Sequence, residues 1–170
     1  MGPCGCGKST VGRLVAGRLS ALFMEGDDFH PEANRTKMAA GEPLTDADRW
    51  PWLDRIAGAC TEAGNGGKEV VVACSALKRV YRERLTSGGT RTIFALLDGP
   101  GQVIRQRLQA RADHFMPVSL LDSQLAALER PAPEENAVIL DIRRRPEDLA
   151  LEIAEHVRMA DLEFKHQAGQ

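Results

Sequence analysis

The sequence has few aromatic residues, few cysteines and no long hydrophobic run. Only 5% of its 170 residues are aromatic, and its four cysteines have no partners at the spacing of a zinc site. A membrane-spanning helix needs about 20 consecutive apolar residues, and no stretch approaches that length. The formal charge of −2 gives no general attraction for nucleic acid. These absences argue against a disulfide-rich, membrane-bound or nucleic-acid-binding protein, and we expect a cytoplasmic one with reduced thiols.

The length and the hydrophobic pattern indicate one domain with a mixed α/β fold. The hydrophobic content is 43%, and short apolar runs alternate with segments of helical periodicity, as in βαβ units with a parallel sheet. We expect strands at 21–25, 70–75, 92–97 and 137–142. Helices are expected at 31–40, 51–63, 76–85, 102–112, 119–129 and 146–159. The sequence therefore predicts a single domain over residues 1–170, with helices on both faces of a parallel sheet.

The opening residues, MGPCGCGKST, match the spacing of a phosphate-binding loop. In such a loop, consecutive backbone N–H groups surround the phosphates of a nucleotide, and glycines let the chain turn close to the anion. Lys8 would reach the β- and γ-phosphates, and the Ser9 hydroxyl would bind Mg²⁺. The helical pattern that follows would direct its positive N-terminal end at the same phosphates. We therefore predict that ATP and Mg²⁺ are bound by Gly2, Gly5, Gly7, Lys8, Ser9 and Thr10.

A phosphate-binding loop normally follows a buried parallel strand, and here only Met1 stands before it. Either the chain as given starts several residues late, or the central strand is missing. We favour the late start, and we expect the first, central strand to be truncated in this chain.

Polar residues concentrate after the strand expected at 21–25, in the segment EGDDFHPEANRTKM. Ligands of open α/β sheets lie beyond the carboxyl ends of the strands, so this segment is a candidate for holding a phosphate acceptor. A solvated acidic turn that caps a helix is the alternative. Because no Asp ends the strand at 70–75, Glu25 and Asp27 are the best candidates for orienting Mg²⁺.

The strand at 92–97 is followed by DGPG, which formally matches a GTPase motif. The guanine-recognition motif N-K-x-D is absent from the sequence, so we interpret DGPG as a turn into a helix. That helix carries Arg105, Arg107 and Arg111. Arginines suit a lid that stabilises charge on a transferring phosphoryl group, although an exposed basic helix face is the alternative.

Five motifs in order carry a family resemblance over about residues 2–142: the phosphate loop, GDDFHPEANRTKM, GEPLTDADRWPWL, CSALKRVYRERL and HFMPVSLLDSQLAALE. With them the chain resembles bacterial-type gluconokinases, small-molecule P-loop kinases related to shikimate kinase. The resemblance implies a three-layer P-loop kinase sandwich with a parallel sheet of about five strands. It also implies a mobile lid at about 105–120, a homodimer, and transfer of the ATP γ-phosphate to the 6-hydroxyl of D-gluconate.

The resemblance also implies roles for individual residues. Asp27 would accept the proton of the attacking hydroxyl, and Glu25, where the family more often has Asp, would orient Mg²⁺. A capping or packing role is an equal alternative for His30, and the two tryptophans of RWPW are interpreted as packing residues. Arg107 and Arg111 would act with Lys8 on the phosphates, and Pro146 would form a wall of the adenine site. The substrate would be held by Asp27, His30, Asn34, Lys37, Arg49, Lys78, Arg82, His114 and Gln124.

Two alternatives to gluconate phosphorylation stay open. The chain could phosphorylate another small hydroxy acid such as shikimate, against which HFMP and CSALK count. It could also be a GTP-binding switch, against which the missing N-K-x-D motif counts.

Overall fold

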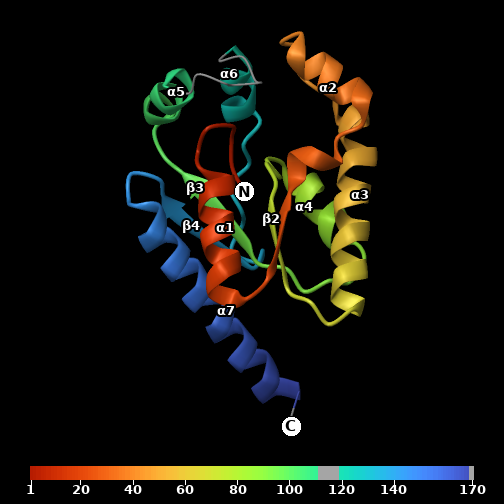
Figure 1. Cartoon of the computed structure of the whole chain (residues 1–170), viewed down its shortest axis with the longest axis vertical. Helices are drawn as coiled ribbons and strands as arrows, with labels where there is room; N and C mark the ends of the chain where they lie inside the picture. Colours follow the sequence, from red (N-terminus) through yellow and green to blue (C-terminus); the bar gives the residue numbers. More distant parts are fainter. Residues whose placement is uncertain (111–118, 169–170) are drawn as a thin grey trace.

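The strands form two parallel pairs in the computed structural model, which describes residues 1–110 and 119–168 (Figure 1). Strand β1 (Leu22–Glu25) pairs with β2 (Val70–Ala73), and β3 (Phe94–Asp98) pairs with β4 (Ala137–Asp141). Each strand lies within two residues of its predicted position. The predicted parallel α/β architecture is therefore confirmed, although the described residues form four strands rather than about five.

Helices cover both faces of the strands. Val71 of β2 packs into a core cluster with α1 (Lys8–Leu19) and α7 (Pro146–Ala168). Val72 and Cys74 pack into a second cluster with α3 (Asp46–Asn65) and α4 (Arg79–Thr86). Since successive strand residues face opposite sides of a sheet, the two clusters lie on opposite faces. Within the described residues, no helix combines the length and apolarity needed to cross a membrane.

Helix α3 begins earlier than the predicted residue 51. The Asp48 backbone N–H donates to the Thr45 hydroxyl at 3.2 Å, and the Thr45 backbone N–H donates to the Asp48 carboxylate at 2.8 Å. This reciprocal capping box starts the helix at Asp46 and leaves Pro51 inside it rather than in its first turn. The early start brings two acidic residues of the first turn, Asp46 and Asp48, to the top of α3.

The remaining elements gather at the end of the molecule where the phosphate loop lies. They are the short 3₁₀ helix η1 (Gly26–Phe29), α2 (Glu32–Ala39), α5 (Gly101–Gln109) and α6 (Ser119–Ala126). In Figure 1, α2 stands on one side of the loop and α5 and α6 stand on the other. Residues from both groups can therefore contribute to a site built around the loop.

Met1 and Gly2 lie between the two strand pairs. The Met1 amino group donates to Ala95 O, Leu97 N donates to Met1 O at 2.9 Å, and Gly2 N donates to Ser75 O at 3.0 Å. Burial lowers the pKa of the Met1 amino group to about 6. The position between β2 and β3 thus contains two residues instead of a strand, which explains the difference from the expected count.

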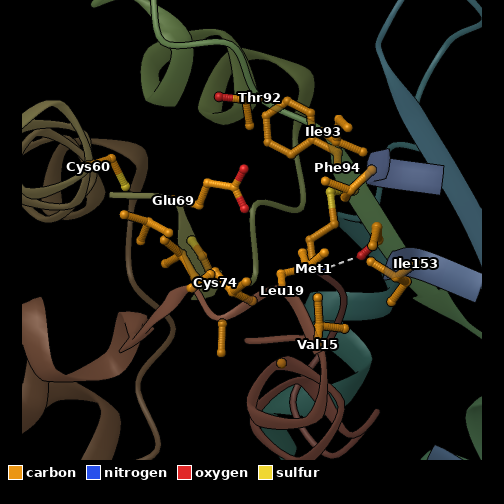
Figure 2. A pocket seen from close by; sticks show the side chains of 18 of the residues that line it. Met1, Val15, Leu19, Cys60, Glu69, Cys74, Thr92, Ile93, Phe94 and Ile153 are labelled. Carbon is orange, nitrogen blue, oxygen red and sulfur yellow. Dashed lines mark hydrogen bonds between the residues drawn. The ribbon is translucent and has the colours of Figure 1, made fainter. Parts of the chain in front are cut away.

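A cavity of about 480 Å³ extends from Met1 between β2 and β3. Figure 2 shows that its lining side chains come from the strands and from the helices on both sides, and that Glu69 also borders it. Its apolar lining includes Val15, Leu19, Cys74, Phe94 and Ile153. The cavity therefore belongs to the interior of the sheet, and apart from Lys8 of the phosphate loop it is lined by none of the residues predicted to bind the nucleotide or the acceptor.

Candidate active site

The phosphate loop has the backbone that its glycines predict. Gly2, Gly5 and Gly7 have φ angles of 135°, 82° and 108°, which side chains rarely permit. A Cβ at Gly5 would lie 2.6 Å from Leu108 Cγ, so the loop also needs a glycine there for space. Gly7 precedes α1 and offers no side chain to the N–H groups of its first turn. Those N–H groups are suited to an anion such as a nucleotide phosphate.

Lys8 folds back over the loop. Its ammonium donates to Pro3 O at 3.0 Å. Burial is the largest single influence on the pKa of Lys8 and acts to lower it, but the side chains of Cys6, Asp27, Cys4 and Cys74 together raise the pKa above its usual value. The ammonium therefore stays charged at neutral pH, as a phosphate-binding lysine requires.

Residues of α5 and α6 contact the backbone of the phosphate loop. The Gln124 side chain of α6 accepts from Cys4 N at 2.6 Å. Arg107 of α5 donates to Ile142 O at 2.7 Å and approaches Cys6 O at 3.5 Å. Pro146, which begins α7, follows Ile142 closely in the chain. Arg107 and Gln124 thus lie at the nucleotide side of the site, whereas Gln124 was predicted to contact the acceptor.

The end of β1 is held rigidly between the strands and α3. A Cβ at Gly26 would lie 2.6 Å from Ala73 O, and Gly26 O accepts from Trp52 Nε1 at 2.7 Å. Glu25 approaches Arg13 of α1 at 4.0 Å. Asp27 is exposed, and its charge acts on both Lys8 and His30. Asp27 therefore lies within electrostatic reach of both the phosphate loop and the residues around α2.

His30 and Asn34 join α2 to α3. The His30 ring stacks on Trp52 with the ring centres 4.2 Å apart, and burial lowers the pKa of His30 to about 4 while Asp27 opposes the shift. The buried Asn34 amide donates to Asp48 O at 2.8 Å and lies 3.2 Å from His30 Nδ1. These contacts favour the packing alternative for a neutral His30, and the packing role expected for Trp52 is confirmed.

Three of the predicted substrate-binding cations have carboxylate partners from the first turn of α3. The Lys37 ammonium lies 2.9 Å from both oxygens of Asp48. The Lys78 ammonium lies 2.8 and 2.9 Å from the oxygens of Asp46, and Arg49 Nη1 lies 3.7 Å from Asp46. The structure thus brings Lys37, Arg49 and Lys78 together around the top of α3.

Arg82 is placed differently from those three cations. Its side chain is 1% exposed and pairs through two nitrogens with the Glu135 carboxylate. Its third nitrogen donates to three carbonyl oxygens, at Ala76, Leu77 and Glu129. Because all of its nitrogens are engaged inside the protein, we leave Arg82 out of the acceptor site and assign it to holding residues 129–135 against α4.

Part of the predicted lid lies outside the described residues. Arg111 and His114 fall in 111–118, so their roles stay predictions. Arg105, at the start of the predicted lid, forms an ion pair with Asp122 of α6. This contact favours the exposed-face alternative for Arg105.

The carboxylates that accompany the cations were not predicted from the sequence. Asp46, Asp48 and Glu135 were not singled out. The sequence does carry a signal for two of them, because Thr45 followed three residues later by Asp48 is the spacing of a capping box. The partner of Arg82 had no such signal, since Glu135 lies far along the chain.

The described residues include no group of three or more His, Cys, Asp or Glu side chains that could hold a metal ion. Magnesium in nucleotide sites is usually held by one or two protein oxygens together with phosphate oxygens and water. Ser9 at the start of α1 and Glu25 at the end of β1 supply a hydroxyl and a carboxylate of that kind. The donor set therefore fits a Mg²⁺ ion that arrives with the nucleotide.

Comparisons with known proteins agree over nearly the whole chain. Residues 4–158 match the family model described as shikimate kinase. The thermosensitive gluconokinase of Escherichia coli (strain K12) is 44% identical over 166 residues, which is 97% of this chain and 87% of that protein. An unliganded sugar kinase from Janibacter sp. HTCC2649 is 43% identical with a TM-score of 0.90, covering 94% of this chain and 92% of that one. A gluconokinase from Sinorhizobium meliloti 1021 is 39% identical with a TM-score of 0.82, covering 98% and 94%.

Proposed function

The chain belongs to the shikimate kinase family, with gluconokinases among its relatives, and we propose that it transfers the γ-phosphate of ATP to the 6-hydroxyl of D-gluconate. The product would be 6-phospho-D-gluconate. The family resemblance and the kinase fold that the sequence predicts are confirmed by these matches. The acceptor, the metal and the residue roles below are proposals.

The observation that carries the proposal is the position of Asp27. Its charge acts both on Lys8 of the phosphate loop and on His30, which packs between α2 and α3. A carboxylate between a phosphate site and a polar acceptor site can orient a hydroxyl for attack and accept its proton. Phosphoryl transfer needs mainly such alignment and neutralisation of charge.

On the nucleotide side, the loop N–H groups and Lys8 would hold the β- and γ-phosphates. Arg107 lies against the loop and would add positive charge there. Pro146 would form part of the adenine site. Mg²⁺, held by Ser9 and oriented by Glu25, would neutralise charge on the phosphate oxygens.

On the acceptor side, Lys37, Arg49 and Lys78 would bind the carboxylate and hydroxyls of gluconate. His30 and Asn34 would shape the wall through their buried contacts with α3. An acceptor with a carboxylate suits this cationic group, whereas a neutral sugar would leave it without a partner.

A panel of acceptors tests the proposed function. Gluconate, glucose and shikimate are compared at fixed Mg-ATP, with ADP release measured by a coupled assay. We expect gluconate to have the highest kcat/KM and Lys8→Met to abolish turnover of gluconate. Comparable kcat/KM for glucose would contradict the assignment of the cations, and a preference for shikimate would identify a different hydroxy acid. Acceptor-independent GTP hydrolysis would indicate a switch protein.

The homodimer that the resemblance suggests stays a prediction. Light scattering on the purified protein measures its mass in solution, and a mass near twice the 18.5 kDa of one chain is expected.

A further inference from the structure

The carboxylate of Asp46 contacts the groups that an anionic acceptor would need. It accepts hydrogen bonds from Lys78 Nζ at 2.8 and 2.9 Å and from the Tyr81 hydroxyl, and it lies 3.7 Å from Arg49 Nη1. Arg49 Nη1 in turn donates to the Tyr81 hydroxyl at 3.3 Å. A carboxylate of the protein is thus placed among cations proposed to bind the carboxylate of the acceptor.

The ion pair between Asp46 and Lys78 is of a kind in which another anion can replace Asp46 as the partner of Lys78. The Asp46 side chain is 45% exposed and that of Lys78 is 30% exposed, and ion pairs of this kind contribute little to stability. The buried pair of Arg82 and Glu135 is different, with side chains 1% and 12% exposed. Separating Lys78 from Asp46 therefore costs little free energy, whereas separating the buried Arg82 from Glu135 costs much more.

Asp48, the other acidic residue that pairs with a predicted substrate cation, is held in place by the helix cap. Besides Lys37, its carboxylate accepts from the backbone N–H and the hydroxyl of Thr45, both at 2.8 Å. If Lys37 were released, the bonds to Thr45 would remain and would keep the Asp48 carboxylate in its present position. The carboxylate of Asp46 contacts the long side chains of Arg49 from α3 and Lys78 from the loop before α4, which can rearrange when an acceptor enters, whereas its third partner, Tyr81, is buried.

We propose that Asp46 is an internal counter-ion that competes with the carboxylate of the acceptor for Lys78 and Arg49, and so limits the affinity for anionic acceptors. The inference rests on the proposed function, because it requires gluconate or a similar anion to bind beside these residues. Removing the charge of Asp46 while keeping its size would then strengthen binding of an anionic acceptor and leave a neutral one unaffected.

Asp46→Asn tests this inference, with Asp54→Asn as the matched control. Asp54 of α3 pairs with Arg84 of α4, at similar exposure and away from the acceptor residues. We expect Asp46→Asn to lower the KM for gluconate about two- to fivefold, the effect of losing one exposed ion pair. The KM for glucose should not change. Asp54→Asn should leave both values as they are, and Asp46→Glu, which keeps the charge, should keep the gluconate KM within about twofold of the unmodified chain.

Calorimetric titration of gluconate without ATP checks that the change lies in binding, and thermal unfolding checks that each variant is folded. An unchanged or raised gluconate KM in folded Asp46→Asn would overturn the inference, since Asp46 would then be a bystander or would position Lys78 productively. If the unmodified chain phosphorylates gluconate normally and only the Asp46→Asn result fails, the proposed function stands without the inference. If the unmodified chain does not phosphorylate gluconate, both fail.

Discussion

At the scale of single residues, we predict separable roles for the two carboxylates at and just after the end of β1, Glu25 and Asp27. Asp27 is exposed and acts on Lys8 and His30, whereas Glu25 is turned toward Arg13 of α1. We expect Asp27→Asn to lower kcat by roughly 10²- to 10⁴-fold, because the amide cannot accept the proton of the hydroxyl. Glu25→Gln should instead raise the Mg²⁺ concentration needed for half-maximal rate.

Titrating both variants with Mg²⁺, ATP and gluconate measures these effects. The affinity for ATP should change little in Asp27→Asn. A small loss of kcat in that variant would mean that Asp27 mainly positions the hydroxyl, since a metaphosphate-like transition state needs little help from a base. If Asp27→Asn shifted only the Mg²⁺ dependence, the two roles would be reversed.

Arg82 and Lys78 stand four residues apart in CSALKRVYRERL, yet the structure gives them opposite surroundings. We expect Arg82→Met to lower the free energy of unfolding by about 3–5 kcal/mol, because the Glu135 carboxylate loses its buried partner. Lys78→Met should change stability by no more than about 1 kcal/mol and should raise the KM for gluconate. Urea denaturation and acceptor kinetics on both variants measure the contrast. If Arg82→Met were as stable as the unmodified chain and had a raised KM for gluconate, Arg82 would belong to the acceptor site.

The difference between these two cations could not be predicted from the sequence. Lys78 and Arg82 lie about one turn apart on the helix predicted at 76–85, and either cation suits an anionic acceptor. Burial of Arg82 depends on residues 129–135, which reach α4 only when the chain has folded. The counter-ion of Lys78 depends on α3 beginning at Asp46 instead of at the predicted Pro51.

At the scale of elements, the contact between α2 and α3 depends on a neutral His30. Burial lowers the pKa of His30 to about 4, below its usual value of about 6.5 in the unfolded chain. The stability that the neutral ring contributes is therefore fully present above about pH 6.5 and is lost as the pH falls toward 4. Protonation would place a charge beside Trp52 and remove the acceptor at Nδ1.

His30→Gln cannot titrate in this range, so it serves as the comparison. We expect the stability advantage of the unmodified chain over His30→Gln to shrink by up to about 3 kcal/mol between pH 7 and pH 4. Urea denaturation at a series of pH values measures the difference in the free energy of unfolding between the two chains. Carboxylates that titrate in both chains largely cancel in that difference. A difference that stays constant over the whole range would show that His30 keeps an ordinary pKa.

Elements whose signals are local were predicted well. The apolar runs identify the strands β1 to β4, and the glycines of the phosphate loop identify its turns, because the physical reason lies within a few residues. The structure also places Lys8 and Arg107 beside the loop. It places Gln124 against the phosphate loop and Arg82 against residues 129–135, and these contacts could not be predicted because they are set by packing between distant segments.

At the scale of the whole molecule, a cavity lies between β2 and β3, and in the part of the chain that the structure describes the backbone of Met1 and Gly2 links the two strand pairs by hydrogen bonds. Adding about five alternating Val and Ile residues before Met1 would provide a strand of usual length for that space. The addition would also replace the buried amino group by an amide that can join the sheet. We expect the midpoint of thermal unfolding to rise by about 5 °C or more.

The control is an addition of the same length with proline at alternate positions, which cannot donate the backbone hydrogen bonds of a strand. Thermal unfolding followed by circular dichroism compares the three chains. Equal midpoints for the Val/Ile and proline additions would show that the cavity does not accept a strand.

Phosphorylation of gluconate at its 6-hydroxyl is best tested by identifying the product of the reaction. The chain is incubated with ATP, Mg²⁺ and gluconate, and the product is identified by ¹H–³¹P correlation NMR. We expect a phosphate coupled to the protons on carbon 6 of gluconate, formed in step with ADP and absent with Lys8→Met. Formation of no phosphorylated gluconate, or a phosphate on another carbon, would contradict the proposed function.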